Sequence, residues 1–170
     1  MVELLVKNPA HCSEEERELF RSILCTRPEI SQDTIASRIS KAGKLAFAYV
    51  DGVPAGIAAV KQARKGFRRR ILEAQTTGSV GELPHSELGW LNVFPIYRGQ
   101  GIGSSLVSSL CEELSGKAVF SLTEPDNKAM RGILMASGFS LCGKIHLEGR
   151  LPYLLYLRPS FNYDWHRPLS

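Results

Sequence analysis

The fold of this chain is decided by the segment Leu91-Asn92-Val93-Phe94-Pro95-Ile96-Tyr97-Arg98-Gly99-Gln100-Gly101-Ile102-Gly103. An apolar run from Leu88 to Phe94 predicts a strand that ends at Pro95. A glycine-rich turn follows, and apolar residues then recur at helical spacing, at Ile102, Leu106, Leu110 and Leu114. Strand, loop and helix therefore form the central unit of the fold.

The glycine loop suits a pyrophosphate. Glycines at 99, 101 and 103 let a ligand approach the backbone, so that N-H groups of the turn and of the first helical turn can point at phosphate oxygens. The positive end of the helix dipole favours the same anion, and the side chains of Arg98 and Ser104 can add to the attraction.

Two further phosphate-binding motifs match the spacing of these glycines less well. A P-loop requires a lysine between its last glycine and the serine or threonine that follows. In this chain Ser104 follows Gly103 directly, so the lysine is missing. A dinucleotide fold requires G-x-G-x-x-G, whereas the spacing here is G-x-G-x-G, although Glu124 lies near the position of the acid in that fold. In the alternative interpretation, the glycines only form a tight turn and Gly103 packs against a neighbouring element.

Two helices and a hairpin are predicted before this unit. Ser13 and Glu16 form a capping box before a helix with Leu19, Phe20, Ile23 and Leu24. A turn at Arg27-Pro28 leads to a second helix through Ile35, Ala36 and Ile39, which is expected to stop near Gly43. Asp51-Gly52 joins two predicted strands, at 44–50 and 53–60.

A strand, a helix and a strand are predicted after it. The first strand covers Ala118 to Leu122, the helix carries Met130, Ile133 and Leu134 and ends at Gly138, and the last strand covers Tyr153 to Leu157. The alternation in this half predicts parallel pairing beside an antiparallel first half. The expected fold class is α/β, a mixed central β-sheet with helices on both faces.

Composition limits the alternatives. With 170 residues and 44% hydrophobic content, the chain can form one core, and we expect a single domain over residues 1–170. No apolar run approaches the length of a bilayer span, and the acidic N-terminal region lacks the pattern of a secretory signal, so we expect a cytoplasmic protein that does not enter a membrane. Scattered cysteines and histidines predict no metal site and no disulfide.

A basic cluster stands out in a chain of formal net charge +4: it comprises Arg64, Lys65, Arg68, Arg69 and Arg70. We interpret it as a solvated hairpin tip, and we do not expect a nucleic-acid partner, because interleaved aromatics and a recognisable binding motif are missing. Positive potential near a cleft concentrates anions, so the cluster also hints at acidic acceptors.

The central segment resembles motif A of the GNAT acetyltransferases. The family signature R/Q-x-x-G-x-G/A is matched by Arg98-Gly99-Gln100-Gly101-Ile102-Gly103, preceded by Val-x-Pro-x-Tyr at Val93 to Tyr97. Downstream, Asn127 begins a helix that Gly138-Phe139 closes at the spacing of the family's other conserved block. The resemblance implies an acetyl-CoA-dependent N-acetyltransferase that acetylates a primary amine of a small molecule or peptide, by direct attack through a tetrahedral intermediate.

The same resemblance assigns the donor contacts. Main-chain N-H groups of Arg98, Gly99, Gln100, Gly101, Ile102, Gly103 and Ser104 would bind the pyrophosphate of acetyl-CoA. Its pantetheine arm would run beside the strand at Leu91, Asn92 and Val93, where the Val93 N-H would polarise the thioester carbonyl, and Asn127 would contact the donor from the end of the next strand. By analogy with the family, a homodimer is possible.

The catalytic residues are less clearly indicated. An alkylamine must lose a proton before it attacks, and Glu87 is the candidate base, with His85 and Glu124 as alternatives. Glu87 lies six residues before Val93, an even separation that places both side chains on one strand face, and histone acetyltransferases of this superfamily carry a glutamate at the matching position. A glutamate at the start of a strand is also commonly just solvated.

The usual general acid of the family, a tyrosine, is replaced by Leu134, for which the apolar pattern predicts core packing. The thiolate then leaves unassisted, or Tyr153 or Tyr156 substitutes, or catalysis is impaired; the last case leaves a non-catalytic acyl-CoA-binding or sensing module as the alternative function. Cys111 is expected to be a buried thiol rather than a nucleophile. Trp90, Phe94 and Phe67 could line an acceptor pocket, but aromatics beside strand centres are more often core.

Overall fold

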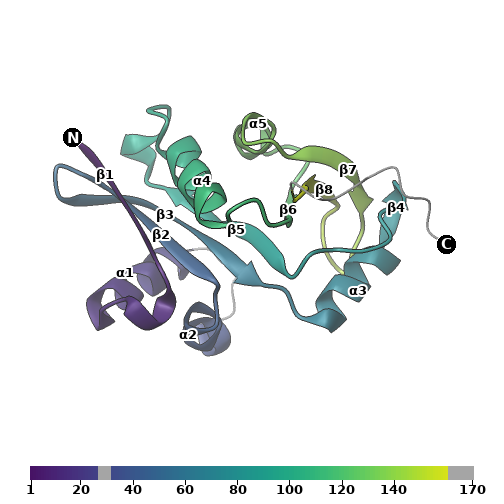
Figure 1. The fold of residues 1–170 in the computed structure, drawn as a ribbon, viewed down its shortest axis with the longest axis horizontal. Coiled ribbons are helices and arrows are strands. Elements are labelled where there is room, and N and C mark those ends of the chain that lie inside the picture. The colour runs from purple at the N-terminus through teal and green to yellow at the C-terminus, as the bar shows by residue number, and fades with distance from the viewer. Residues whose placement is uncertain (27–31, 161–170) are drawn as a thin grey trace. The chain divides into compact units, whose positions relative to one another are not determined.

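The computed structural model describes residues 1–26 and 32–160, which form two compact units. Unit 1 comprises Met1–Gln62 and Gly89–Glu113, and unit 2 comprises Ala63–Leu88 and the chain from Leu114 onward. Strand β5 (Ser86–Val93) contributes its first three residues to unit 2 and the rest to unit 1. Figure 1 shows the course of the chain. The predicted turn at Arg27-Pro28 lies outside the described residues.

Unit 1 begins with an antiparallel sheet of three strands in sequence order. They are β1 (Val2–Lys7), β2 (Lys44–Val50) and β3 (Val53–Gln62). The predicted hairpin is confirmed, since Asp51 and Gly52 both take positive φ, 49° and 79°, as a tight two-residue turn requires. Strand β1 corrects the sequence prediction, in which two helices preceded the sheet.

The helices of unit 1 cover both faces of its strands. Helix α1 (Glu14–Leu24) begins at the predicted capping box, and α2 (Gln32–Ser40) follows it. On this face the rings of Phe20 and Phe47 pack edge to face at 5.6 Å. Helix α4 (Ile102–Glu113) covers the opposite face of the strands, as Figure 1 shows. It begins directly after the glycine loop, as predicted.

In unit 2 the start of β5 pairs in parallel with β6 (Val119–Thr123). The last strand, β8 (Tyr153–Arg158), then pairs antiparallel with β6, which corrects the prediction of parallel pairing throughout this half. Two short strands complete the series, β7 (Ser140–Ile145) against β8 and β4 (Gln75–Thr77) against β7. Neither β7 nor β4 was predicted from the sequence.

Helix α3 (Lys65–Glu73) replaces the hairpin tip that the basic cluster predicted. Ile71 is fully buried, and Phe67 and Leu72 pack against the same core of unit 2. These apolar residues recur at helical spacing, so one side of the segment enters the core and the cations occupy the other. The interpretation as a hairpin tip was therefore wrong, although the prediction that the cations are mostly exposed is confirmed.

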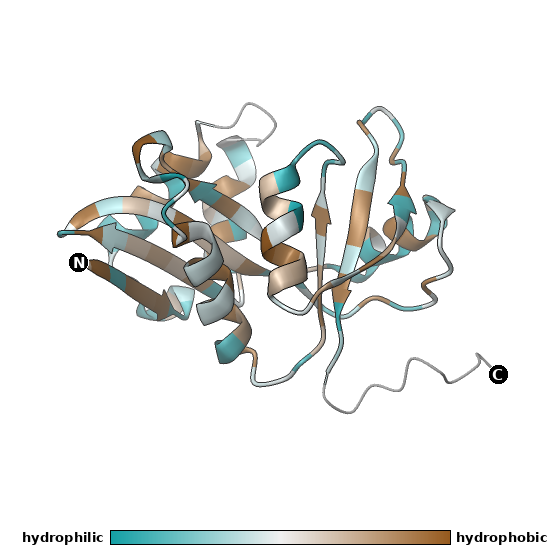
Figure 2. Cartoon of the chain, turned by 90° about the horizontal axis from the view of Figure 1, so that it is seen from above, coloured by the Kyte–Doolittle hydropathy of each residue, from teal (hydrophilic) through white to brown (hydrophobic). Residues whose placement is uncertain are grey.

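Helix α5 (Lys128–Ala136) ends as predicted, because Gly138 takes φ 83° just beyond it. The strands of both units carry much of the hydrophobic colour in Figure 2, and apolar clusters of described residues occur in unit 1 and in unit 2. Within residues 1–26 and 32–160, none of the helices has the length and apolar character needed to cross a membrane.

Candidate functional site

The glycine loop has a backbone that only glycine adopts easily. Gly99 and Gly101 take φ 76° and 80°, and a side chain added at either position would meet no atom within 4 Å. The space beside these two residues is therefore open to a ligand. The backbone there is accessible to a group as small as a phosphate.

Side-chain hydrogen bonds hold the loop in shape without covering it. The guanidinium Nε of Arg98 donates to the Val93 carbonyl at 2.9 Å, and the Gln100 amide donates to the Ile96 carbonyl at 3.1 Å. Helix α4 starts at Ile102, so the N-H groups of its first turn have no acceptor within the helix and point toward the loop. These donors and the helix dipole together favour an anion.

Strand β5 runs from Ser86 to Val93, but its backbone is distorted at Trp90. This buried residue takes φ 54°, a left-handed conformation that is rare for a bulky side chain. A distortion of this kind disturbs the alternation of side chains, so the even separation of Glu87 and Val93 is not enough to place them on one face.

Contacts from three other elements of unit 1 hold the Trp90 ring. The Arg38 guanidinium lies 5.2 Å and the Lys61 ammonium 5.5 Å from the ring centre, and the Phe20 ring lies 6.0 Å away. Sequence reasoning identified the core role of Trp90 but missed its backbone conformation and the two cations. No pattern in the sequence marks either feature.

Glu87 is only 7% exposed, which is unusual for a carboxylate. It pairs in register with Phe120 on β6, so the two side chains share a face, and Phe120 belongs to the same apolar cluster as Ile71 of α3. The interpretation of Glu87 as a solvated glutamate does not hold.

The reserve candidates for the base are both exposed. The His85 carbonyl accepts a hydrogen bond from the Ala63 N-H at 2.7 Å, and the Glu124 carbonyl accepts one from the Asn127 N-H at 3.1 Å. Asn127 itself is the N-cap of α5, where its side-chain oxygen accepts from the Met130 N-H at 3.0 Å. Its side-chain amide group can still donate to a ligand.

Leu134 and the tyrosines of the last strand have different environments. Leu134 is fully buried in α5, which confirms its predicted place in the core. Tyr156 is 1% exposed, and its hydroxyl accepts a hydrogen bond from Arg131 Nε at 3.3 Å. Tyr153 is partly buried against the core of unit 2. The aromatics Trp90, Phe94 and Phe67 all pack against the two apolar clusters, as predicted.

None of the four cysteines, all of which lie in the described part of the chain, forms a disulfide. Cys111 is buried in α4, as predicted. Burial raises the pKa of the Cys12 and Cys142 thiols above the ordinary value, which disfavours the nucleophilic thiolate at both positions. Among the described residues, no group of three or more histidine, cysteine or acidic side chains could hold a metal ion.

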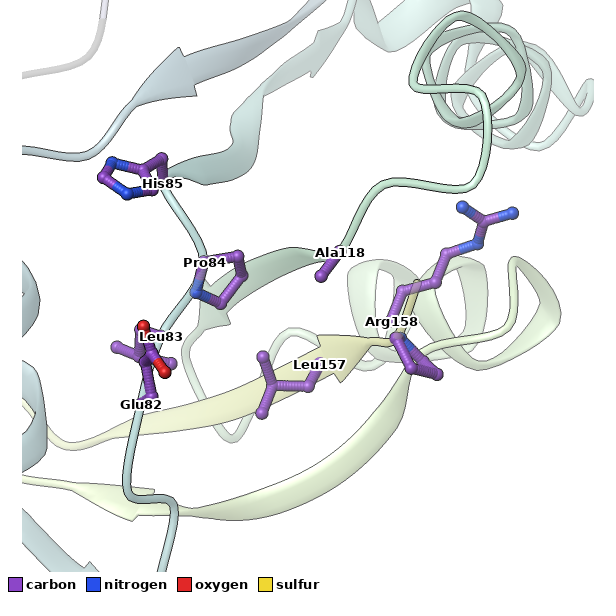
Figure 3. A pocket seen from close by; sticks show the side chains of 8 residues that line it. Glu82, Leu83, Pro84, His85, Ala118, Leu157 and Arg158 are labelled. Carbon is purple, nitrogen blue, oxygen red and sulfur yellow. The ribbon is translucent and has the colours of Figure 1, made fainter. Parts of the chain in front are cut away.

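A cavity of about 160 Å³ lies within unit 2. The segment Glu82–His85 forms one side of it, and Ala118 with the end of β8 forms the other, as Figure 3 shows. The lining is mostly apolar, and charge is supplied by Glu82 and Arg158. No pattern in the sequence predicts this cavity, because its walls come from three segments far apart in the chain.

Comparison with known proteins places these features in a family. The family model described as "Acetyltransferase (GNAT) family" matches residues 10–139, which include parts of both units. A curated relative, N-acetyltransferase YodP of Bacillus subtilis (strain 168), is 32% identical over 79 residues, 45% of this chain. The matched segment spans 29% of the length of that relative.

Solved structures share the fold. An acetyltransferase of the GNAT family from Streptococcus agalactiae 2603 aligns with TM-score 0.70 at 18% identity, covering 92% of this chain and 95% of its own. The ribosomal-protein-S18-alanine N-acetyltransferase from Escherichia coli aligns with TM-score 0.64 at 16% identity, covering 98% of this chain and 100% of its own. At these identities the likeness shows the fold alone.

Proposed function

The chain belongs to the acetyltransferase (GNAT) family, whose members transfer an acyl group from an acyl-CoA donor. We propose that it transfers acetyl from acetyl-CoA to a primary amine. The acceptor is a small molecule or a peptide, and the amine attacks directly, through a tetrahedral intermediate. The observation that carries the proposal is the open glycine loop at the N-terminus of α4.

The donor is held mainly by backbone groups. N-H groups from Arg98 to Ser104 bind the pyrophosphate, and the strand at Leu91 to Val93 binds the pantetheine arm. The Val93 N-H donates to the thioester carbonyl and stabilises the oxyanion that forms on attack. The side-chain amide of Asn127 adds a further contact. The open space beside Gly99 and Gly101 supports this arrangement, because no side chain competes with the phosphates.

Glu87 accepts the proton of the attacking amine, directly or through one water. Its burial supports this role, because the Glu87 side chain is shielded from bulk water at the start of β5. His85 and Glu124 are exposed and so lack that advantage. The role of Glu87 is separate from donor binding, and the two can be tested separately.

The CoA thiolate leaves without a dedicated acid. The family's usual tyrosine is replaced by Leu134, and the Tyr156 hydroxyl is buried against Arg131. A thiol pKa of about 8.5 makes the thiolate a tolerable leaving group. Tyr153, which is only partly buried, is the remaining candidate for a proton donor.

The test combines calorimetric CoA binding with thiol release from acetyl-CoA over a panel of amines and peptides. We expect CoA to bind and an acceptor to drive thiol release. We expect Glu87→Gln to lower kcat by about 100-fold or more and to leave CoA affinity unchanged. Absence of CoA binding would refute the proposal. CoA binding without turnover on any acceptor would instead favour the acyl-CoA-sensing module.

Three further expectations belong to the proposal. Residues 1–170 act as one N-acetyltransferase domain, the protein works in the cytoplasm, and it can form a homodimer. The family match supports the first, because it runs continuously through segments of both units.

A further inference from the structure

We propose that unit 2 selects an acidic peptide as acceptor, with the exposed cations of α3 binding its carboxylates and the cavity beside Glu82–His85 taking one apolar side chain. This inference rests on the proposed acetyl transfer and specifies its substrate class. It starts from the distribution of charge in the chain.

The net charge of the chain is concentrated in one short segment. Residues 64–73 contain five of its 21 Lys and Arg and one of its 17 Asp and Glu, which leaves sixteen of each sign elsewhere. The formal net charge of +4 therefore resides on α3 and its N-cap, Arg64. A local excess of this kind attracts anions to one place rather than to the whole surface.

Most of these cations are exposed to solvent: Arg64, Lys65, Arg69 and Arg70. Arg69 has a loose contact with Glu73 at 3.6 Å, and among the described residues the structure gives no ion pair to Arg64, Lys65 or Arg70. Arg68 differs, because its Nη1 donates to the Leu83 carbonyl at 2.7 Å. This bond ties α3 to the segment that lines the cavity.

The packing of α3 argues against a membrane or a nucleic acid as its partner. Ile71 is fully buried, and Phe67 and Leu72 pack against the core, so no apolar side remains to enter a bilayer. The only aromatic residue of the helix is Phe67, and because it packs into the core it offers no stacking platform for bases. Cations without exposed apolar or aromatic neighbours suit carboxylates on a peptide.

The dimensions of α3 also suit a peptide. A helix of nine residues is about 13.5 Å long, the length of about four residues of extended chain. Alternate residues of an extended chain point to the same side, so two carboxylates of one peptide can face the helix at once. The cavity of about 160 Å³ has room for one aliphatic side chain or a phenyl ring, and Leu83, Pro84, Leu157 and Pro159 line it.

Both features lie close in the chain to the proposed base. The Ala63 N-H, just before α3, donates to the carbonyl of His85, a cavity residue two positions before Glu87. All of these residues belong to unit 2. A peptide bound to α3 and the cavity would therefore have its amine near the start of β5, where Glu87 lies.

The experiment measures binding and turnover of peptides with a free amino terminus. The first peptide contains leucine and several glutamates, the second replaces each glutamate by glutamine, and the third replaces the leucine by glycine. A dye-labelled form of each is titrated with the protein in the presence of CoA, at low salt and at about 0.5 M salt. An oligonucleotide of equal charge competes in a parallel titration.

Two sets of variants isolate the cations. The test variant carries three substitutions on α3 and its N-cap: Arg64→Gln, Lys65→Gln and Arg70→Gln. The matched control variant removes the same charge from three other exposed positions of unit 2: Lys117→Gln, Lys144→Gln and Arg150→Gln. Loss of three exposed ion pairs between the protein and the acidic peptide should weaken binding of that peptide by roughly 3- to 100-fold at low salt. The difference in affinity should be smaller at high salt. The control variant should bind as the wild type does.

The cavity is tested with Ala118→Leu, which fills it from one wall. We expect this variant to bind the leucine-containing peptide more weakly than the wild type does, and to bind the glycine-substituted peptide with unchanged affinity. Equal binding of the acidic and neutral peptides, or equal binding by the test and control variants, would overturn the proposal. Tighter binding of the oligonucleotide would replace it by a nucleic-acid partner. These outcomes do not depend on catalysis, whereas loss of CoA binding or turnover would count against the proposed function alone.

Discussion

Substitution of Gly101 should separate ligand binding from backbone strain. Gly101 and Gly52 have almost the same φ, 80° and 79°, and a Cβ at either position meets no atom within 4 Å. Gly101→Ala and Gly52→Ala therefore carry the same strain, about 1–2 kcal/mol each. For a chain of this size, that strain should lower the Tm of both variants by about 2–8 °C.

The effect on the donor should differ between the two variants. At Gly101 the new methyl group enters the space from which phosphate oxygens would reach the loop, whereas Gly52 lies in the β2–β3 turn. Loss of one charge-assisted hydrogen bond costs about 1.5–3 kcal/mol, which corresponds to roughly 10- to 150-fold in affinity. Calorimetric titration with CoA and thermal unfolding of the apoprotein measure the two effects. If Gly52→Ala loses as much CoA affinity as Gly101→Ala, or if neither variant loses any, the assignment of the loop is refuted.

Three other predictions concern the described packing and ionisation. Leu134→Ala should destabilise the protein by about 2–5 kcal/mol in urea unfolding, because this side chain is fully buried; a loss below about 1 kcal/mol would contradict its core role. A hydrogen bond from Lys7 lowers the pKa of Glu16, so the stability it contributes is present above the ordinary carboxyl pKa of 4.5 and is lost as the pH falls through the lower, folded value. Glu16→Gln, which keeps the capping box, should therefore flatten the dependence of Tm on pH in that acid range, and Glu14→Gln serves as the control. Because burial raises the pKa of Cys142, mass spectrometry at pH 8 should find slower alkylation of this thiol than of a short cysteine peptide, and equal rates would count against its burial.

The features that the sequence predicted correctly depend on short-range geometry. The capping box of α1 involves two residues three positions apart, and both of its hydrogen bonds form. The Asp51-Gly52 turn and the Gly138 helix end each require positive φ, which these residue types adopt easily. The glycine loop belongs to the same class, so its position and its backbone could be predicted together.

The missed strands depend on partners far away in the chain. β1 has only six residues, and it forms because each of them pairs with a residue of β2, from Leu45 to Val50. β4 has three residues, and its strand character comes only from pairing with β7. The basic cluster was assigned to a hairpin tip for a related reason. Its interpretation considered the five cations and not the helical spacing of Phe67 and Ile71, which directs one side of α3 to the core.

Trp90 shows why the catalytic assignment could not be completed from the sequence. A left-handed backbone at this bulky residue costs about 1–3 kcal/mol, so other contacts must fix it. The contacts come from Phe20, Arg38 and Lys61, on three separate elements. Because the positive φ of Trp90 disturbs the alternation of β5, counting residues alone cannot relate Glu87 to Val93. The assignment of Glu87 as the base therefore depends on its burial, and a change in kcat without a change in CoA affinity is the result that would support it.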